Sequence, residues 1–204
     1  MADPEHLDKL AEGVEAWNTW RRQQDLLFRP DLANAKFRGV DFHGIHLGSA
    51  LLREVDLEGA RLTAANLRGA DLEGANLTFA DLSQAELVGT RLRSARLQAC
   101  DLRRTTLFEA NFEDADLREA DFSEADMAEA HFVGADLRSV NLSGVTRWTP
   151  QGLRGANIHG VCHPPPGFVE EALASGAVDE PSRDAWLARK RRTASSGPRG
   201  SRRA

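Results

Sequence analysis

The side chains best suited to binding a partner are acidic and lie close together in the chain. Between Leu107 and Ala130 there are nine carboxylates and one base, Arg118, a net charge of −8. Such a cluster can attract a positively charged partner, although salt weakens the attraction. It can equally be a solvated surface that keeps molecules apart. We predict nine partner-binding carboxylates: Glu109, Glu113, Asp114, Asp116, Glu119, Asp121, Glu124, Asp126 and Glu129.

The other reactive side chains do not form a recognisable active site. His159, Cys162 and His163 are close in sequence, but the fourth ligand that a zinc site needs is not apparent. Cys100 falls in a register of small residues, which favours packing over a role as a nucleophile. No serine has an evident paired base, and no phosphate-binding loop or dinucleotide fingerprint is present. We therefore expect no enzyme, no cofactor and no metal.

The elements that hold these side chains follow from a five-residue period, seen in GADLEGANLTFADL at positions 69–82. From Leu32 to Leu142 every fifth residue is Leu, Phe or Met, at 23 positions without exception, and we call these residues centres. Alanine fills 15 of the 23 places two residues before a centre. The residue directly before is often Asp or Asn, which bind local backbone groups in turns. Helices and strands have other periods, 3.6 and 2.0 residues.

One large and one small inward residue in every five cannot form a core within a single repeat. If each repeat turns the chain by about a quarter circle, twenty residues complete a square coil, and neighbouring coils pair at about 4.8 Å. Each buried Leu or Phe contributes about 1.5–3 kcal/mol, against about 1–2 kcal/mol of backbone entropy for every ordered residue. Only a long stack is therefore stable, and the sequence predicts an all-β solenoid.

Stacking places residues that are twenty apart side by side. Asp81, Asp101 and Asp121 should form one column. Val88 and Phe108 should lie outward on neighbouring coils, as a candidate contact with a partner or a second copy. A basic band precedes the acidic stretch, so the charge is predicted to alternate along the stack; its members are Arg91, Arg93, Arg96, Arg103 and Arg104.

The tandem A(D/N)Lxx pattern, as in Ala75-Asn76-Leu77 and Ala115-Asp116-Leu117, resembles the pentapeptide-repeat family from about Asp31 to Val145. The resemblance implies a right-handed quadrilateral β-helix, here of about six coils. It also implies a protein-interaction scaffold, and this is our main functional prediction, with the partner unknown. Some members resemble DNA in width and charge and bind DNA gyrase or topoisomerase IV, which protects these enzymes from quinolones or natural toxins. That is the alternative, although the Arg band interrupts the negative surface.

Both ends of the stack need caps. A capping helix is predicted from Asp3 to about Gln24, with Asp3 as N-cap and an apolar stripe that includes Leu10 and Trp17; a partner-binding helix is the alternative. Leu153 and Ile158 resume the period one residue out of phase. Short helices are expected at 168–173 and 184–191. The predicted segments are a helical cap (1–29), the repeats (30–146), an out-of-phase partial coil (147–163), a C-terminal helical segment (164–192) and a disordered basic tail (193–204).

Composition suggests where the protein works. Hydrophobic residues make up 41% and charged residues 28%, which suits a folded, soluble chain. No start resembling a signal peptide and no apolar run of about twenty residues is seen, so we expect no membrane span and a cytoplasmic location. The scarcity of lysine beside arginine suggests a bacterial source. From Arg183 onward the net charge is +7, and this Arg-rich tail suggests a weak contact with nucleic acid.

Overall fold

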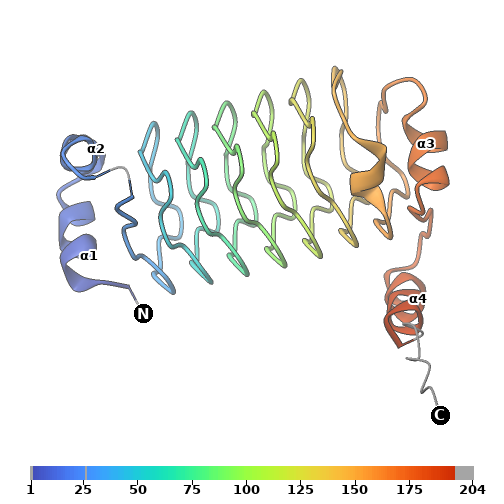
Figure 1. Cartoon of the computed structure of the whole chain (residues 1–204), viewed down its shortest axis with the longest axis horizontal. Helices are drawn as coiled ribbons and strands as arrows, with labels where there is room; N and C mark the ends of the chain where they lie inside the picture. The colour runs from blue at the N-terminus through green and yellow to red at the C-terminus, as the bar shows by residue number, and fades with distance from the viewer. Residues whose placement is uncertain (1, 26, 196–204) are drawn as a thin grey trace, which may run out of the picture.

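The computed structural model describes residues 2–25 and 27–195, and shows a row of stacked coils between two groups of helices (Figure 1). One pair of helices stands at each end of the row. A short 3-10 helix, η1, lies in the last part of the stack. The elements are α1 (Pro4–Ala11), α2 (Val14–Arg22), η1 (Pro150–Leu153), α3 (Phe168–Ala174) and α4 (Arg183–Ser195). The division into five segments stays a prediction.

Each coil contains twenty residues, because parallel bridges join residues twenty apart from Asp31↔Leu51 to Asp121↔Asn141. A coil has four sides of five residues. The column of Asp81, Asp101 and Asp121 lies on one of them, as predicted, through the bridges Asp81↔Asp101 and Asp101↔Asp121. Each side contributes isolated bridged residues and no extended strand. The number of coils, about six, therefore stays a prediction.

The backbone of one repeat shows why the stack is rigid. Phe112 and Asp114 donate their N–H groups to carbonyls of the next coil, at 2.7 and 3.0 Å. Ala115 donates back to the carbonyl of Phe112 at 3.0 Å, and Asp116 donates to the preceding coil at 3.0 Å. Asp114 has a φ of 60°, the left-handed conformation that turns the corner. We call the second residue after each centre the corner residue.

The remaining N–H of the repeat belongs to the residue after the centre, and the frequent Asp or Asn before the centre accepts its hydrogen bond. Asn111 Oδ1 accepts from the N–H of Glu113 at 2.8 Å, and Asp121 Oδ1 accepts from that of Ser123 at 2.8 Å. This confirms that these residues serve local turns. Every backbone donor of such a repeat is thus paired, four with backbone carbonyls and one with the side chain that precedes the centre.

The centres fill the shaft. All are buried except Phe37, which is partly buried in the first coil. Inside the acidic stretch the rings of Phe112 and Phe132 stack with centroids 5.0 Å apart and planes within 2°. Cys100 is buried, and its Sγ–H donates to the carbonyl of Ala80 at 3.1 Å. It acts as a packed small residue there, and its burial raises the pKa of the thiol well above its usual value.

The N-terminal cap is two helices, where a single helix was expected. Gly13 precedes α2 with a φ of 102°, a left-handed value that breaks the helix and lets α2 turn across the first coil. The predicted stripe survives the break, because Leu10 of α1 and Trp17 of α2 are both buried. The indole N–H of Trp17 donates to the carbonyl of His46 at 2.8 Å. Asp3 caps α1 as predicted, accepting from the N–H of Glu5 at 2.9 Å.

The C-terminal part of the stack has a longer step. After residue 141 the bridges join residues 21 apart, as in Met127↔Trp148 and Asp136↔Asn157. This confirms the predicted slip by one residue. The expected helices correspond to α3 and α4, but α4 continues to Ser195. It thus enters the segment expected to be disordered, of which residues 196–204 lie outside the described part.

The segment 164–192 is not helical throughout. Between α3 and α4 the chain returns to the stack, where Val178 bridges Asn157. The N–H of Val178 donates to the carbonyl of Ala156 at 2.8 Å, and Ile158 donates to Val178 at 2.9 Å. These bonds pair an edge of the last coil that would otherwise be open.

Candidate interaction surface

The nine predicted carboxylates are distributed around the coil and do not form a single patch. Five are corner residues with φ between 55° and 63°: Glu109, Asp114, Glu119, Glu124 and Glu129. Three occupy bridged positions: Asp116, Asp121 and Asp126. Glu113 follows the centre Phe112. Their role in binding a partner stays a prediction.

Several of these carboxylates are paired with arginines on neighbouring coils. Arg104 lies 3.0 Å from Glu124, Arg147 lies 2.8 Å from Asp126, and Arg93 lies 3.7 Å from Glu113. Two members of the predicted basic band, Arg93 and Arg104, therefore face the acidic stretch across the stack and neutralise part of it. The net charge of the segment therefore overstates the charge of the surface.

Asp116 belongs to an ionic cluster around one buried carboxylate, that of Asp136, which the sequence analysis missed. Asp136, directly above it in the ladder, is only 2% exposed and lies 2.7 Å from Arg138 and 3.8 Å from Arg118. Arg118 also lies 2.7 Å from Asp116, and Arg183 of α4 approaches Asp116 at 3.6 Å. A signal was present, because the letters ADLR occur at 115–118 and again at 135–138, twenty residues apart.

The electrostatics of the cluster favour the charged forms. Burial by itself raises the pKa of Asp116, but the hydrogen bonds and positive charge of Arg118 outweigh it and lower that pKa overall. The bond to Asp116 raises the pKa of Arg118, and the bond to Asp136 raises that of Arg138. The charged forms of Asp116, Arg118 and Arg138 are therefore stabilised by their partners within the cluster.

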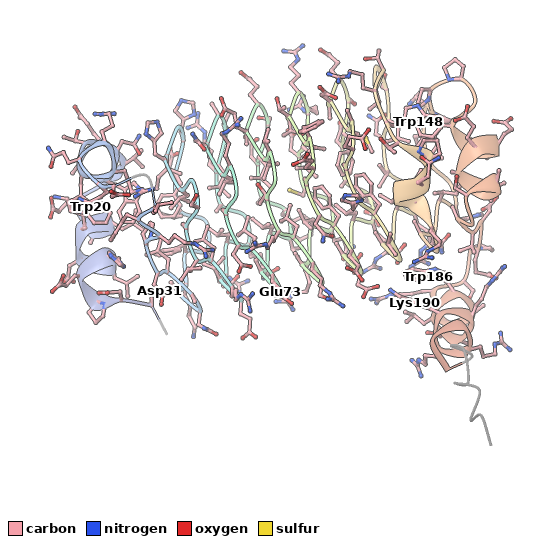
Figure 2. All side chains as sticks on the ribbon, in the orientation of Figure 1. Trp20, Asp31, Glu73, Trp148, Trp186 and Lys190 are labelled. Atoms are coloured by element: carbon pink, nitrogen blue, oxygen red, sulfur yellow. The ribbon has the colours of Figure 1, made fainter. Side chains whose placement is uncertain are left out.

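Helix α4 lies against the same part of the rod. Lys190 Nζ is 2.6 Å from Asp114 Oδ1 and donates to the carbonyl of Gly134 at 2.7 Å. Trp186 is 4% exposed, and its indole N–H donates to the carbonyl of Gly155 at 3.4 Å. Figure 2 shows both side chains at the junction of α4 with the last coils. Two predicted tail bases, Arg183 and Lys190, thus face the rod, and the predicted contact of the tail with nucleic acid gains no support.

Helix α4 lies over a row of corner glycines, which we call the glycine track: Gly134, Gly155 and Gly176. Each lies 21 residues after the preceding one, and each has a positive φ. Without side chains these corners leave room for the helix. A cleft of about 640 Å³ remains between α4 and the rod, with Arg154, Trp186 and Lys190 among its walls. These glycines are visible in the sequence, but their alignment at one corner is not, because it depends on the 21-residue spacing of the bridges in this part of the stack.

The neighbouring side of the acidic stretch has a different character. Val88 and Phe108 lie on neighbouring coils, as expected, joined by the bond from the N–H of Gly89 to the carbonyl of Phe108 at 2.9 Å. Phe108 is 38% exposed, and Val88 is half-buried. The adjoining corner carries Glu109 and, one coil on, Glu129. Within residues 2–25 and 27–195 neither glutamate has an ion-pair partner within 4.0 Å. We call Val88, Phe108, Glu109 and Glu129 the Phe108 surface.

The remaining candidates are simpler. In the part of the chain that the structure describes, no group of three or more His, Cys, Asp and Glu residues could hold a metal ion. His159 instead contacts Asp179, with Nδ1 and Oδ1 2.6 Å apart, and Cys162 is exposed. No described helix is both long and apolar enough to cross a bilayer.

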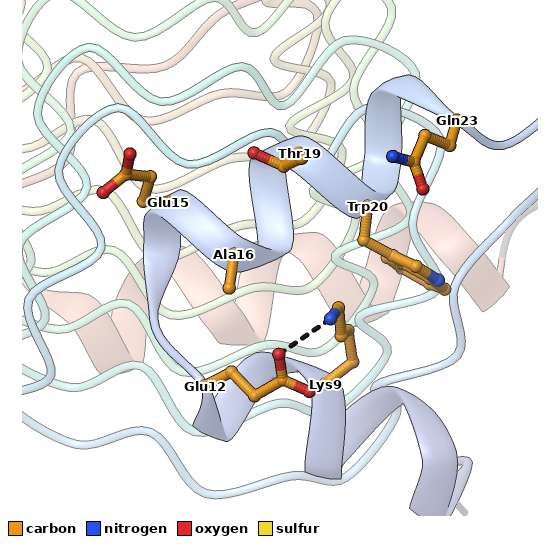
Figure 3. Close-up of a pocket in the computed structure, with 7 residues that line it drawn as sticks. All are labelled: Lys9, Glu12, Glu15, Ala16, Thr19, Trp20 and Gln23. Carbon is orange, nitrogen blue, oxygen red and sulfur yellow. Dashed lines mark hydrogen bonds and ion pairs between the residues drawn. The ribbon is translucent and has the colours of Figure 1, made fainter.

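The N-terminal cap carries an open hollow of about 520 Å³ between α1 and α2 (Figure 3). Trp20 forms one wall, and Lys9 pairs with Glu12 at 2.7 Å across it. Its lining is mostly polar, and two of its charged residues, Lys9 and Glu12, are paired with each other. The partner-binding alternative for this cap stays a prediction.

Comparison with known proteins agrees with this geometry. A family model described as pentapeptide repeats matches the chain in eight copies, over residues 31–69, 70–107 and 106–144. The family fold is a right-handed quadrilateral β-helix, in agreement with the four-sided coils seen here. No curated protein of matching sequence is found.

Among solved structures, HetL from the cyanobacterium Nostoc sp. strain PCC 7120, a pentapeptide repeat protein involved in regulating heterocyst differentiation, is 29% identical with a TM-score of 0.57, covering 79% of this chain and 68% of HetL. The pentapeptide repeat protein alr5209 from Nostoc PCC 7120 is 41% identical over 46% of this chain and 67% of its own, with a TM-score of 0.30. QnrB1, a plasmid-mediated fluoroquinolone resistance protein, is 14% identical over 79% and 89%, with a TM-score of 0.36.

Proposed function

Because the chain belongs to the pentapeptide-repeat family, we propose that it is a non-enzymatic scaffold that binds another protein on the outside of its stack. The observation that carries the proposal is the Phe108 surface. There an exposed aromatic ring adjoins two carboxylates that have no ion pair in the described chain, and the stack holds this surface through the bond from the N–H of Gly89 to the Phe108 carbonyl and the bond from the N–H of Glu129 to Thr149 Oγ1. A rigid surface loses little conformational entropy on binding.

The chemistry of this surface indicates what its partner carries. An exposed ring with an apolar neighbour fits an apolar pocket, and aromatic anchors of this kind often dominate an interface. Glu109 and Glu129, at one corner on neighbouring coils, favour Lys or Arg at the rim of that pocket. The proposed partner is therefore a protein with a basic surface around an apolar depression.

A crosslinking experiment tests this proposal. A photoreactive phenylalanine analogue placed at position 108 should capture the partner in cells, and the same analogue at Phe79, which is 63% exposed on another side, is the matched control. The captured protein, once purified, should lose about tenfold or more in affinity for the Phe108→Ser variant. Equal capture through both positions, or an unchanged affinity for Phe108→Ser, would exclude this surface as the binding site.

The second candidate is DNA mimicry directed at DNA gyrase or topoisomerase IV. Four predicted carboxylates favour it, because they are free of ion pairs in the described chain: Glu109, Glu119, Asp121 and Glu129. The arginines that neutralise neighbouring acids count against it. Supercoiling of relaxed plasmid by gyrase, with and without ciprofloxacin, should respond to the wild type and not to a variant with these four residues changed to Lys. No response to excess wild type would reject the idea for that enzyme.

We also propose that the protein works in the cytoplasm. The proposal rests on the composition and on the two cysteines, which are both free, one buried and one exposed. Fractionation of source cells tests it, and recovery of the protein in a membrane or extracellular fraction would contradict it.

A further inference from the structure

We propose that the surface beneath α4 is a second binding site, which accepts a basic helix of another protein, and that α4 occupies this site as a built-in competitor. The site consists of Asp114, Asp116 and the glycine corners Gly134 and Gly155. It lies one side of the coil away from the Phe108 surface, since Asp114 and Glu109 occupy neighbouring corners, and it does not depend on the function proposed for that surface.

The site beneath α4 binds cationic side chains through groups from several coils. One ammonium, that of Lys190, is held by the Asp114 carboxylate at 2.6 Å and the Gly134 carbonyl at 2.7 Å. A guanidinium, that of Arg183, lies 3.6 Å from Asp116. Charge-assisted bonds of this kind are stronger than neutral ones, and the carbonyl adds a directional acceptor. The site therefore selects a partner with two cationic side chains at a fixed separation.

The shape of the site also specifies which residue of the partner helix lies between the two cationic residues. Arg183, Trp186 and Lys190 are spaced i, i+3 and i+7, so they share one face of α4. The Trp186 ring is buried, its N–H meets the Gly155 carbonyl at 3.4 Å, and Lys190 Nζ lies 5.0 Å from the ring centroid. The partner helix should thus carry a base, an aromatic residue and a base at this spacing.

Helix α4 is attached in a way that lets it leave without disturbing the stack. The last bridge of the ladder is Asn157↔Val178, and Asn157 also holds the Glu180 backbone through bonds of 2.8 and 3.2 Å. Only Pro181 and Ser182 separate this anchor from α4. Among residues 183–192, Trp186 alone is buried. An isolated helix of this length is marginal in water, so docking and helix formation should be coupled.

Competition by a labelled peptide tests the proposal in the full-length chain. The probe is a fluorescent peptide with the sequence of residues 182–195, and a peptide with Trp186 and Lys190 moved to other positions is its control. The peptide should bind the Trp186→Ala/Lys190→Ala variant about tenfold or more tightly than the wild type, whose own α4 fills the site. Adding Asp114→Asn and Asp116→Asn to that variant should remove the gain, whereas adding Phe108→Ser should not.

Three results would overturn the proposal. They are equal binding of the peptide by the wild type and the Trp186→Ala/Lys190→Ala variant, failure of that variant to bind the peptide in low-salt buffer, and equally tight binding of the rearranged peptide. Hydrogen exchange gives an independent check, because saturating peptide should raise amide exchange in α4 of the wild type and leave the coils unchanged. Unchanged α4 exchange would also reject competition for this site. Failure of the Phe108 crosslink would not affect either measurement.

Discussion

Two parts of the acidic stretch, a quarter of a coil apart, use similar residues to opposite effect. Beneath α4, Asp114 and Asp116 are paired with Lys190, Arg118 and Arg183. At the Phe108 surface, Glu109 and Glu129 have no ion pair in the described chain, and an aromatic ring is exposed beside them. The difference comes from residues one coil away and from the C-terminal helix. The net charge of a segment therefore does not reveal which of its carboxylates are available to a partner.

The largest effect on stability is expected on the side that α4 covers, which we call the covered side. Asp136→Asn keeps the local backbone acceptor but leaves Arg118 and Arg138 without their buried counter-charge, at an expected cost of about 2–3 kcal/mol in the free energy of unfolding. Urea denaturation measures it. The control is Asp121→Asn, at the equivalent place in another repeat, where the bridged neighbour Asp101 is also acidic. A loss at Asp121 as large as that at Asp136 would show that the ionic cluster is not special.

The glycine track offers the next test. A Cβ at Gly134 would lie 2.6 Å from Asp114 Oδ1 and 3.1 Å from Lys190 Nζ, so Gly134→Ala should displace α4. Gly59→Ala is the matched control, since Gly59 has a similar φ of 65° and open space around its Cβ position. Both changes should cost about 1–2 kcal/mol of backbone strain, but only Gly134→Ala should raise amide exchange in α4. Equal exchange in the two variants would contradict the close contact.

Acid should weaken the covered side. Because the pKa of Asp116 is lowered in the folded chain, its contribution to stability is complete above the pKa of the unfolded chain, about 3.9, and is lost as the pH falls through the lower folded value. Unfolding midpoints measured on both sides of that range should fall less steeply for Asp116→Asn than for the wild type. Parallel curves would mean that Asp116 takes no part in the acid response.

The smallest effect is expected on the open side. Phe108→Ser removes a ring that is 38% exposed and supports no backbone bond, so the free energy of unfolding should change by about 0.5 kcal/mol or less. Thermal and urea unfolding of the purified variant would check this. A much larger loss would assign Phe108 to the packing of the rod, and the Phe108 surface would then be structural.

The sequence predicted the stack because its cause is local and repeated. Leu and Phe at every fifth position bury themselves only if the coil closes in twenty residues, and a single slipped residue before Leu153 becomes a step of 21. The N-cap at Asp3 is equally local. The break at Gly13 was missed because the apolar stripe continues across it, so the pattern is the same for one helix or two.

The site was harder to predict because its contacts are distant in sequence. Lys190 meets Asp114 across 76 positions, and no periodic pattern links a C-terminal helix to a particular corner. The Asp136 cluster could have been found, since ADLR recurs twenty residues apart. The pairing of Arg104 with Glu124 could have been found in the same way, from the stacking rule alone. Burial of Trp186 follows from packing that the sequence does not state.

The absence of long-range crossings in the ladder has a mechanical consequence. In the described ladder each coil is bridged only to the coils before and after it, so once α4 is released, tension applied at the two ends of the chain acts on one coil at a time. Each released coil would lengthen the chain by about 70 Å of contour. The protein should therefore extend under force in steps of similar length, as the coils unfold one after another from the ends of the stack.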